Sequence, residues 1–312
     1  MRQNGKLTIL LYHGVTDIAS SGIENYSGKH CNRAEFNNEM EFIKKNCNIL
    51  SMDDVITHFS KRKVFPENSV VVTFDDGFKN NYTIALPILS RLSIPATFYV
   101  CPGIIGTDDM FWVDKLEDCI NRTKKDVIEI EISGKSERFP LTDREKRIFA
   151  LESIKRHCKS VSNAEKDGIL ESLTVEAEVE PDVNASENYR AMTWDDIVDL
   201  NRHPGINVGG HSFTHTILSA LSADEMKTEI TRSIEMLETH LKTKVRHYSY
   251  PEGQEKHYNT AIIEFLKECG ILCSPSAIDG VNTLEDDLFQ LKRIMPHFYG
   301  KPFPFKNRGD AK

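Results

Sequence analysis

Short apolar segments alternate with amphipathic segments along most of the chain. In the amphipathic segments the apolar residues recur every three or four positions, as they do on one face of a helix. This alternation predicts strand–helix units around a largely parallel sheet, and therefore an α/β fold. The expected strands are 7–12, 70–74, 96–100, 206–209, 246–250, 271–274 and 289–294.

Capping residues indicate where several helices begin. Asn32 is followed three positions later by Glu35, and Ser51 by Asp54, which are pairs typical of helix starts. Gly270 follows the last periodic segment, as glycine often does at the end of a helix. The longer helices are expected at 32–47, 81–92, 193–200, 222–241 and 257–269.

The regular alternation breaks down between about 106 and 190. Within this stretch we expect a hairpin over 127–141 and two polar helices near 143–160 and 163–173. A stretch of this length with its own secondary structure is typical of an insertion. We therefore expect one domain over the whole chain, residues 1–312, with a mostly helical insertion that is a candidate lid or side lobe.

The composition argues against a nucleic-acid or membrane partner. The net charge is −8 and the longest basic run is Lys61–Lys63, so no clustered basic face is expected. The apolar run Leu7–Leu11 is shorter than a signal-peptide core of about 7–15 residues, and no run approaches the roughly 20 residues of a membrane span. Seven scattered cysteines have neither disulfide nor zinc-knuckle spacing. These features predict a cytoplasmic protein.

Two adjacent carboxylates follow the expected strand at 70–74. Asp75 and Asp76 stand within Thr73–Gly77, and in βα folds the loops that leave the strands build the active site. Neighbouring carboxylates repel one another unless a cation or a shared proton relieves the repulsion. An ordinary Asp-Gly turn is the alternative interpretation.

A pair of histidines provides the second half of a candidate metal site. His211 and His215 are four residues apart, which places both rings on one side of a helical turn. With eleven histidines in the chain such a pair also arises by chance, but this pair follows the strand at 206–209. Two histidines and one aspartate leave coordination positions open, which is typical of catalytic zinc. The second aspartate is then free to act as a base.

These motifs resemble those of the polysaccharide deacetylase family, also called the NodB-homology domain or carbohydrate esterase family four. Thr73–Gly77 matches the family's TFDDG motif, and His211–His215 matches its H-[ST]-x-x-H motif. The Leu-Leu-Tyr-His sequence at 10–13 is similar to the opening of one bacterial branch. The resemblance covers residues 7–105 and 190–300, and it implies a distorted, incomplete (β/α) barrel.

The resemblance also implies a metal-dependent hydrolase that removes the N-acetyl group of a sugar. Asp75 would be the general base, and Asp76, His211 and His215 would be ligands of one divalent transition ion. Zinc is the expected ion, with cobalt, nickel and manganese as alternatives. In the cytoplasm the expected substrate is a small or carrier-linked N-acetyl sugar of surface-polysaccharide synthesis. Oligomers of chitin or peptidoglycan and non-sugar amides are the alternatives that the family offers.

The third motif departs from the family pattern. The family often has an arginine there that orients the base, but this chain has Ser-Tyr-Pro-Glu-Gly at 249–253. Glu252 replaces a tyrosine whose backbone N–H completes the oxyanion hole in the family, and the N–H of Glu252 is expected to serve instead. Tyr250 of the same motif is a further candidate for substrate binding. Arg293, near the end of the last expected strand, is the candidate partner of Asp75, and a surface arginine is the alternative.

Three further residues are weaker candidates. His297 loosely matches the family's L-x-H motif and is a candidate general acid, with a purely structural histidine as the alternative. His13 ends the first expected strand and is a candidate to line the cleft. Trp112 is a candidate to stack on a sugar ring, with core packing of the insertion as the alternative.

Two other functions are compatible with part of this pattern. Two histidines and a carboxylate also hold Fe(II) in oxygenases, but such a site leaves the second of the two adjacent aspartates unexplained. A sugar-binding protein that has lost its chemistry is the non-enzymatic alternative. The presence of all four core residues argues against it.

Overall fold

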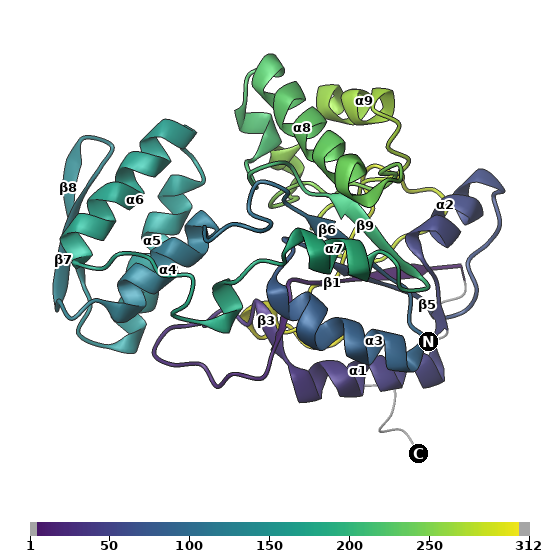
Figure 1. Ribbon diagram of the computed structural model, residues 1–312, viewed down its shortest axis with the longest axis horizontal. Coiled ribbons are helices and arrows are strands. Elements are labelled where there is room, and N and C mark those ends of the chain that lie inside the picture. The colour runs from purple at the N-terminus through teal and green to yellow at the C-terminus, as the bar shows by residue number, and fades with distance from the viewer. Residues whose placement is uncertain (1–4, 306–312) are drawn as a thin grey trace. The chain divides into compact units, whose positions relative to one another are not determined.

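The computed structural model describes residues 5–305, which form two compact units (Figure 1). Their segments are 5–17, 27–107 and 191–305 for the first unit, and 18–26 and 108–190 for the second. The second unit therefore contains almost all of the insertion expected at 106–190. It also contains the short segment 18–26, which the sequence analysis did not assign to the insertion.

Parallel strands form the sheet of the first unit. They are β1 (Leu7–Tyr12), β4 (Asn48–Ile49), β5 (Ser69–Phe74), β6 (Ala96–Val100) and β9 (Ile206–Gly210). Their order is β1–β5–β6–β9, and β4 pairs with the start of β5. The strands expected at 7–12, 70–74, 96–100 and 206–209 are confirmed. A separate parallel pair, β2 (Gly14–Thr16) and β3 (His30–Asn32), was not predicted.

Extended segments, rather than regular strands, continue the ring from β9 back to β1. Single parallel bridges join Gly210 to Tyr248, His247 to Cys273, Pro275 to Leu291, and Ile294 to Leu10. The predictions of regular strands at 246–250, 271–274 and 289–294 are therefore wrong, although these segments do lie in the ring. Pro251 and Pro275 lack the N–H that a ladder needs, which keeps these pairings short. The result is the expected distorted, incomplete (β/α) barrel.

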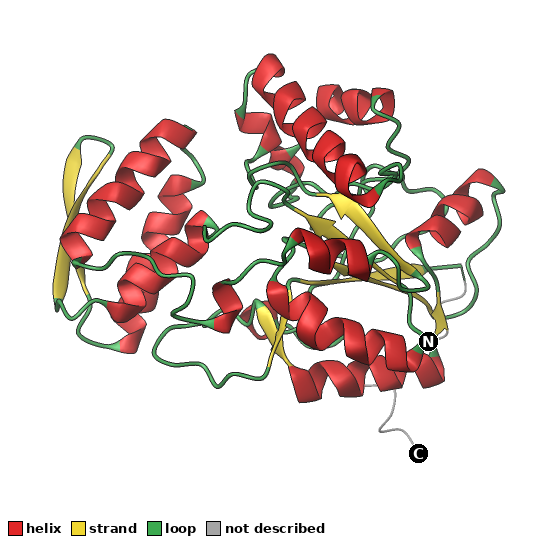
Figure 2. Cartoon of the chain, in the orientation of Figure 1, coloured by secondary structure: helices red, strands yellow, loops and turns green. Residues whose placement is uncertain are grey.

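Helices alternate with these strands in the first unit (Figure 2). They are α1 (Arg33–Asn46), α2 (Met52–Ser60), α3 (Leu86–Leu92), α7 (Trp194–Leu200), α8 (Ala223–Leu241) and α9 (Thr260–Glu268), with the short turns η1 (Asn81–Ala85), η3 (Leu218–Ala220), η4 (Glu255–His257) and η5 (Phe298–Gly300). Capping boxes begin α2 at Ser51, α7 at Thr193 and α8 at Ser222. The helix expected at 81–92 begins as the π-helical turn η1, because Pro87 has no N–H to donate to the preceding turn.

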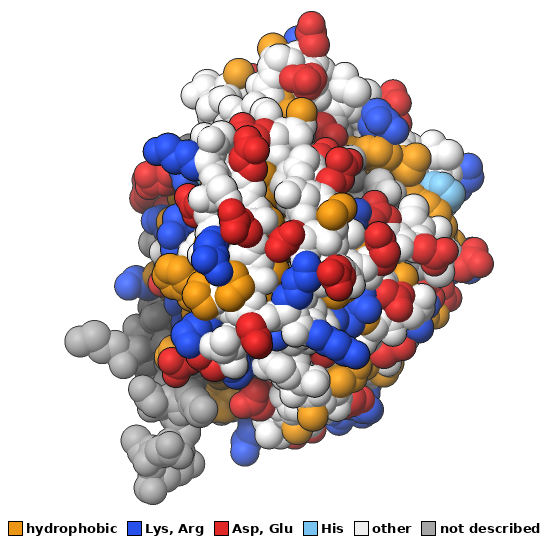
Figure 3. Space-filling model, turned by 90° about the vertical axis from the view of Figure 1, so that its left-hand side faces the viewer, with side chains coloured by type: hydrophobic (Ala, Val, Ile, Leu, Met, Phe, Trp, Pro, Cys, Tyr) orange, Lys and Arg blue, Asp and Glu red, His pale blue; other side chains and the backbone are white. Residues whose placement is uncertain are grey.

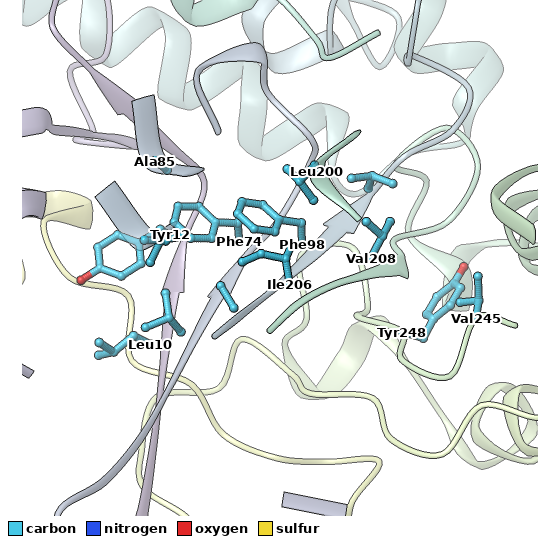
Figure 4. Packing of buried hydrophobic residues seen from close by; sticks show 14 of the residues in the cluster. Leu10, Tyr12, Phe74, Ala85, Phe98, Leu200, Ile206, Val208, Val245 and Tyr248 are labelled. Atoms are coloured by element: carbon cyan, nitrogen blue, oxygen red, sulfur yellow. The ribbon is translucent and has the colours of Figure 1, made fainter. Parts of the chain in front are cut away.

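Aromatic side chains from neighbouring strands pack together in the core of the first unit (Figure 4). Phe74 of β5 stacks on Phe98 of β6, with ring centroids 4.6 Å apart and ring planes at 10°. Tyr12 of β1 lies 5.6 Å from Phe74 by the same measure. Because Phe74 directly precedes Asp75, this packing fixes the end of β5 that carries the two carboxylates.

The second unit has a core of its own. Its elements are α4 (Trp112–Arg122), β7 (Val127–Ile132), β8 (Lys135–Pro140), α5 (Arg144–Cys158), α6 (Asn163–Ala177) and the turn η2 (Glu187–Tyr189). The predicted hairpin and the two predicted helices are confirmed. α4 was not predicted, because buried acidic residues interrupt its apolar face: Asp114, Glu117 and Asp118. Ile23, from the segment 18–26, packs in this core, and its N–H donates to Asn121 Oδ1 at 2.8 Å.

The surface carries both signs of charge. β8 exposes most of its side chains, including Lys135, Glu137 and Arg138. Acidic and basic side chains are interspersed across the face drawn in Figure 3, so that face has a mixed rather than a single-sign charge. Between residues 5 and 305, no helix is long and apolar enough to cross a membrane.

Candidate active site

The ends of two strands hold the four motif residues. Asp75 and Asp76 directly follow β5, and His211 directly follows β9. The N–H of Asp75 donates to Tyr12 O at 2.9 Å, and that of His211 donates to Val100 O at 3.0 Å. The sheet hydrogen bonding thus extends one residue beyond each strand and fixes the backbone of both motifs.

Three side chains are spaced as ligands of one metal ion. Asp76 Oδ1 lies 3.5 Å from His211 Nε2 and 3.4 Å from His215 Nε2. Two donors that are each about 2.0 Å from a tetrahedral ion lie about 3.3 Å apart, so these distances match. Asp76 Oδ1 is buried and accepts no hydrogen bond from the described residues. A buried carboxylate oxygen without a donor fits a site that a divalent cation completes.

A backbone contact sets the tautomer of one candidate ligand. His211 Nδ1 lies 2.9 Å from the carbonyl oxygen of Ser249. A carbonyl only accepts, so Nδ1 carries the proton and Nε2 keeps its lone pair toward Asp76. The ring of His215 stands at 65° to that of His211, with centroids 5.0 Å apart.

The loop between the two histidines is held by residues that the sequence did not predict. Both oxygens of Glu229, on α8, accept hydrogen bonds from this loop: Oε2 from the N–H groups of Phe213 at 2.8 Å and Thr214 at 3.1 Å, and Oε1 from the Thr214 hydroxyl at 2.9 Å. The phenol oxygen of Tyr248 accepts from the N–H of Ser212 at 2.8 Å. Glu229 is one of many polar residues on its helix, so no sequence signal distinguishes it.

The carboxylate of Asp75 is paired with Arg293. Arg293 Nη1 donates to Asp75 Oδ1 at 2.8 Å and Nη2 donates to Oδ2 at 2.7 Å, which is a bidentate contact. Arg293 also donates from Nε to Ser276 O at 2.6 Å and from Nη2 to Ser249 Oγ at 2.7 Å. The arginine is only 1% exposed, so it is not a surface residue. The contact expected between Arg293 and Asp75 is present, and its role in catalysis stays a prediction.

Opposite charges keep both aspartates ionised. Burial raises the pKa of Asp75, but the charge of Arg293 and its hydrogen bonds are the main opposing causes, and the net pKa lies below its ordinary value. Burial likewise raises the pKa of Asp76, while the charge of His13 and the contacts with His211 and His215 bring it well below the ordinary value. Both carboxylates are therefore charged near neutral pH.

Two candidate residues lie in the segment 249–253. Glu252 has a φ of +61° and lies three residues beyond Ser249, whose carbonyl contacts His211. Its use as an oxyanion donor stays a prediction. The side chain of Tyr250, which was a candidate for substrate contact, is instead in the core. Its hydroxyl donates to Phe289 O at 2.9 Å and its ring stacks on Tyr258 at 4.3 Å, so its phenol does not face a substrate.

The two other candidate histidines lie in different surroundings. His13 is half-buried and its Nδ1 has no hydrogen-bond partner among the described residues. Burial lowers the pKa of His13, while the charges of Asp76 and Asp75 act in the opposite direction. His297 Nε2 instead lies 2.7 Å from Glu39 Oε1, on α1. The role of each histidine stays a prediction.

Trp112 belongs to the second unit, where it begins α4. Its side chain packs against the core of that unit, and Lys166 Nζ lies 5.7 Å from the centre of its ring system. These contacts agree with the core-packing alternative, and a contact between Trp112 and a sugar stays a prediction.

We expect Glu229→Ala to weaken metal binding although Glu229 is not a ligand. Without its carboxylate the loop loses three hydrogen bonds, and the two histidines are no longer held at ligand spacing. The affinity for Zn²⁺, measured by competition with a chromophoric chelator, should fall on the order of 10–100-fold. Glu235→Ala, at an exposed position on the same helix, is the matched control. Equal zinc affinity in the two variants would show that the loop keeps its shape without Glu229.

Two known proteins of similar sequence are poly-β-1,6-N-acetyl-D-glucosamine N-deacetylases. The one from Staphylococcus aureus is 24% identical over 172 residues, which cover 55% of this chain and 51% of that protein. The one from Staphylococcus epidermidis is 26% identical over 197 residues, which cover 61% and 63%. The chain thus spans between half and two thirds of the length of these relatives.

Solved structures share the fold over nearly the whole chain. The Streptococcus pyogenes deacetylase PplD in complex with acetate and IcaB from Ammonifex degensii each superpose with a TM-score of 0.60 at 17% identity, over 94% of this chain and 93% of theirs. The sequence pattern named polysaccharide deacetylase matches residues 62–146 and 177–273, which is more than half of the chain. The chain belongs to the polysaccharide deacetylase family.

Proposed function

We propose that this protein is a metal-dependent hydrolase that removes the acetyl group from an N-acetylated sugar. The observation that carries the proposal is the spacing of Asp76, His211 and His215 as ligands, beside the ionised Asp75. A divalent ion held by these three side chains would supply a Lewis acid that polarises the acetyl carbonyl and acidifies a water molecule. Zinc is the ion that suits two imidazoles and one carboxylate.

Asp75 is suited to remove the proton of the attacking water. Its low pKa keeps it in the basic form near neutrality, and the fork of Arg293 fixes the orientation of its oxygens. Attack on the acetyl carbon gives a tetrahedral oxyanion, for which the N–H of Glu252 is the proposed donor. The C–N bond then breaks to give acetate, and the sugar amine leaves with a proton from a general acid.

Two histidines are candidates for that general acid. His297 contacts Glu39, whereas the charges of Asp75 and Asp76 raise the pKa of His13 against the effect of burial, and one of its ring nitrogens has no hydrogen-bond partner within residues 5–305. We favour His13 because it directly follows Tyr12, which pairs with Phe74 at the end of β5 that carries the two aspartates, and a proton donor must lie close to the reacting centre.

The relatives favour a sugar polymer or oligomer as substrate over the small or carrier-linked sugar that was expected from the predicted cytoplasmic location. Both relatives are named for a β-1,6-linked chain of N-acetyl-D-glucosamine. We propose oligomers of N-acetylglucosamine as the substrate class. Acetate release from a panel of β-1,6-linked oligomers, chitin oligomers, and free and nucleotide-linked N-acetyl sugars, with and without a chelator, tests both the substrate and the metal requirement.

Asp75→Asn and Asp76→Asn should have different effects on metal and activity. An amide at 75 cannot accept a proton, so that variant should retain zinc and lose on the order of 10²–10⁴ in kcat. An amide at 76 is a poor ligand, so that variant should lose both zinc and activity. Metal content by elemental analysis and kcat from acetate release check the two roles. If zinc is lost from Asp75→Asn and kept in Asp76→Asn, the roles are reversed.

Arg293→Met should shift the acidic limb of the pH–rate profile to higher pH. The guanidinium lowers the pKa of Asp75, so its removal raises that pKa, and the base becomes protonated at a higher pH than in the wild type. Arg293→Lys keeps the charge without the fork and should shift the limb less. Bound zinc and circular dichroism identify variants that have not folded. A profile that does not move in a folded Arg293→Met variant would contradict the proposed partnership.

His13→Ala and His297→Ala should distinguish the two candidate general acids. Loss of the true donor should lower kcat on the order of 10²–10⁴ and remove the basic limb of the pH profile. We expect the larger loss for His13→Ala, measured as acetate release at full zinc occupancy. His203→Ala, at a partly exposed residue that lies shortly before β9 in the sequence, is the control. A larger loss for His297→Ala would restore His297 as the donor.

A further inference from the structure

A tight turn near the end of the described chain presents an aromatic ring to solvent. Tyr299 is 55% exposed, although it is held in the left-handed region with a φ of +48°. His297 also has a positive φ, of +68°. Non-glycine residues adopt this backbone only where their surroundings enforce it, and they often do so at functional sites.

Several backbone hydrogen bonds enforce the conformation of this turn. The N–H of Tyr299 donates to Ser27 O at 2.6 Å, and that of Gly300 donates to His297 O at 2.8 Å. The N–H of His297 donates to Lys301 O at 2.7 Å. The backbone that carries the Tyr299 ring is therefore fixed before a ligand binds, so less conformational entropy is lost on binding.

Aromatic contacts connect Tyr299 to the candidate active site. Its ring meets that of Phe298 edge-on, with centroids 4.5 Å apart and planes at 70°. The ring of Phe298 in turn stacks on that of His13, with centroids 6.3 Å apart and ring planes at 26° to each other. His13 directly follows β1, whose last residue, Tyr12, pairs with the last residue of β5, Phe74. The exposed ring is thus two aromatic contacts away from a histidine at the strand ends that carry Asp75.

We propose that Tyr299, supported by Phe298, forms a subsite for a second sugar ring of the substrate. The proposal rests on the proposed function and narrows its substrate class to saccharides of two or more rings. The C–H faces of a pyranose are apolar and pack on aromatic rings, while the Tyr299 hydroxyl can hydrogen-bond the sugar's polar edge. A single sugar at the reacting centre would leave this ring exposed, whereas an adjoining sugar would cover it.

Tyr299→Ala tests the subsite through substrate preference. The measured quantity is the ratio of kcat/KM for a β-1,6-linked pentamer of N-acetylglucosamine to kcat/KM for the single sugar. An aromatic contact of about 0.5–1.5 kcal/mol corresponds to a fall in this ratio of roughly two- to tenfold. Most of the fall should be an increase in KM for the pentamer. Tyr299→Phe keeps the ring and should retain most of the preference.

Phe149→Ala is the matched control, since Phe149 is another exposed aromatic residue, on α5 of the second unit. An unchanged ratio in Tyr299→Ala, or an equal fall in Phe149→Ala, would overturn the subsite. If the wild type releases acetate from no sugar, the proposed function fails, and calorimetric binding of the pentamer then decides on the subsite. Weaker binding in Tyr299→Ala supports it, whereas equal binding, or no binding to the wild type, overturns it.

Discussion

A buried guanidinium holds together the end of the barrel that carries the candidate active site. Arg293 pairs with Asp75 through both oxygens and also reaches Ser249 Oγ and Ser276 O. These partners come from the end of β5 and from two of the irregular segments of the ring, and Arg293 itself belongs to the third. Charged hydrogen bonds thus join segments that have no regular ladder. Removing two charges from water is costly, so such a pair is weak support for stability. The pair does suit the proposed role of Asp75, because a base must stay ionised and fixed in orientation.

Backbone strain occurs at several other residues of the candidate active site. Asp76, Ser212, His215 and Glu252 all have positive φ values, between +56° and +78°, although none is glycine. Each such residue costs on the order of 1–3 kcal/mol of folding free energy, so it persists only where its surroundings enforce this backbone conformation. The carboxylate of Glu229 and the other contacts of the loop between His211 and His215 enforce part of this strained backbone. The hydrogen bonds around the site therefore keep the candidate metal ligands and their backbone in a geometry that the isolated chain would not adopt.

Features that depend on neighbouring residues could be predicted from the sequence, and features that depend on distant contacts could not. The capping box at Ser222 and the hairpin turn are local signals. The two motifs of the candidate metal site, Thr73–Gly77 and His211–His215, are likewise short and contiguous. The segments after β9 have strand-like composition, but their prolines limit the pairing to single bridges. Glu229 has no signal in the sequence, because its function depends on a loop that only the fold brings near. Arg293 was predicted because the third motif lacks an arginine that the resemblance led us to expect.

The segment 18–26 belongs to the second unit, and this limits how that unit can be removed from the protein or produced separately. The chain enters that unit twice, first through the short segment that contains Ile23 and later through the long insertion. A truncation that removed 108–190 would leave Ile23 without the apolar side chains that now cover it, and a transplanted 108–190 would lack Ile23 from its own core. The second unit is therefore a discontinuous module, and gene segments that encode it as one contiguous piece would omit part of its interior.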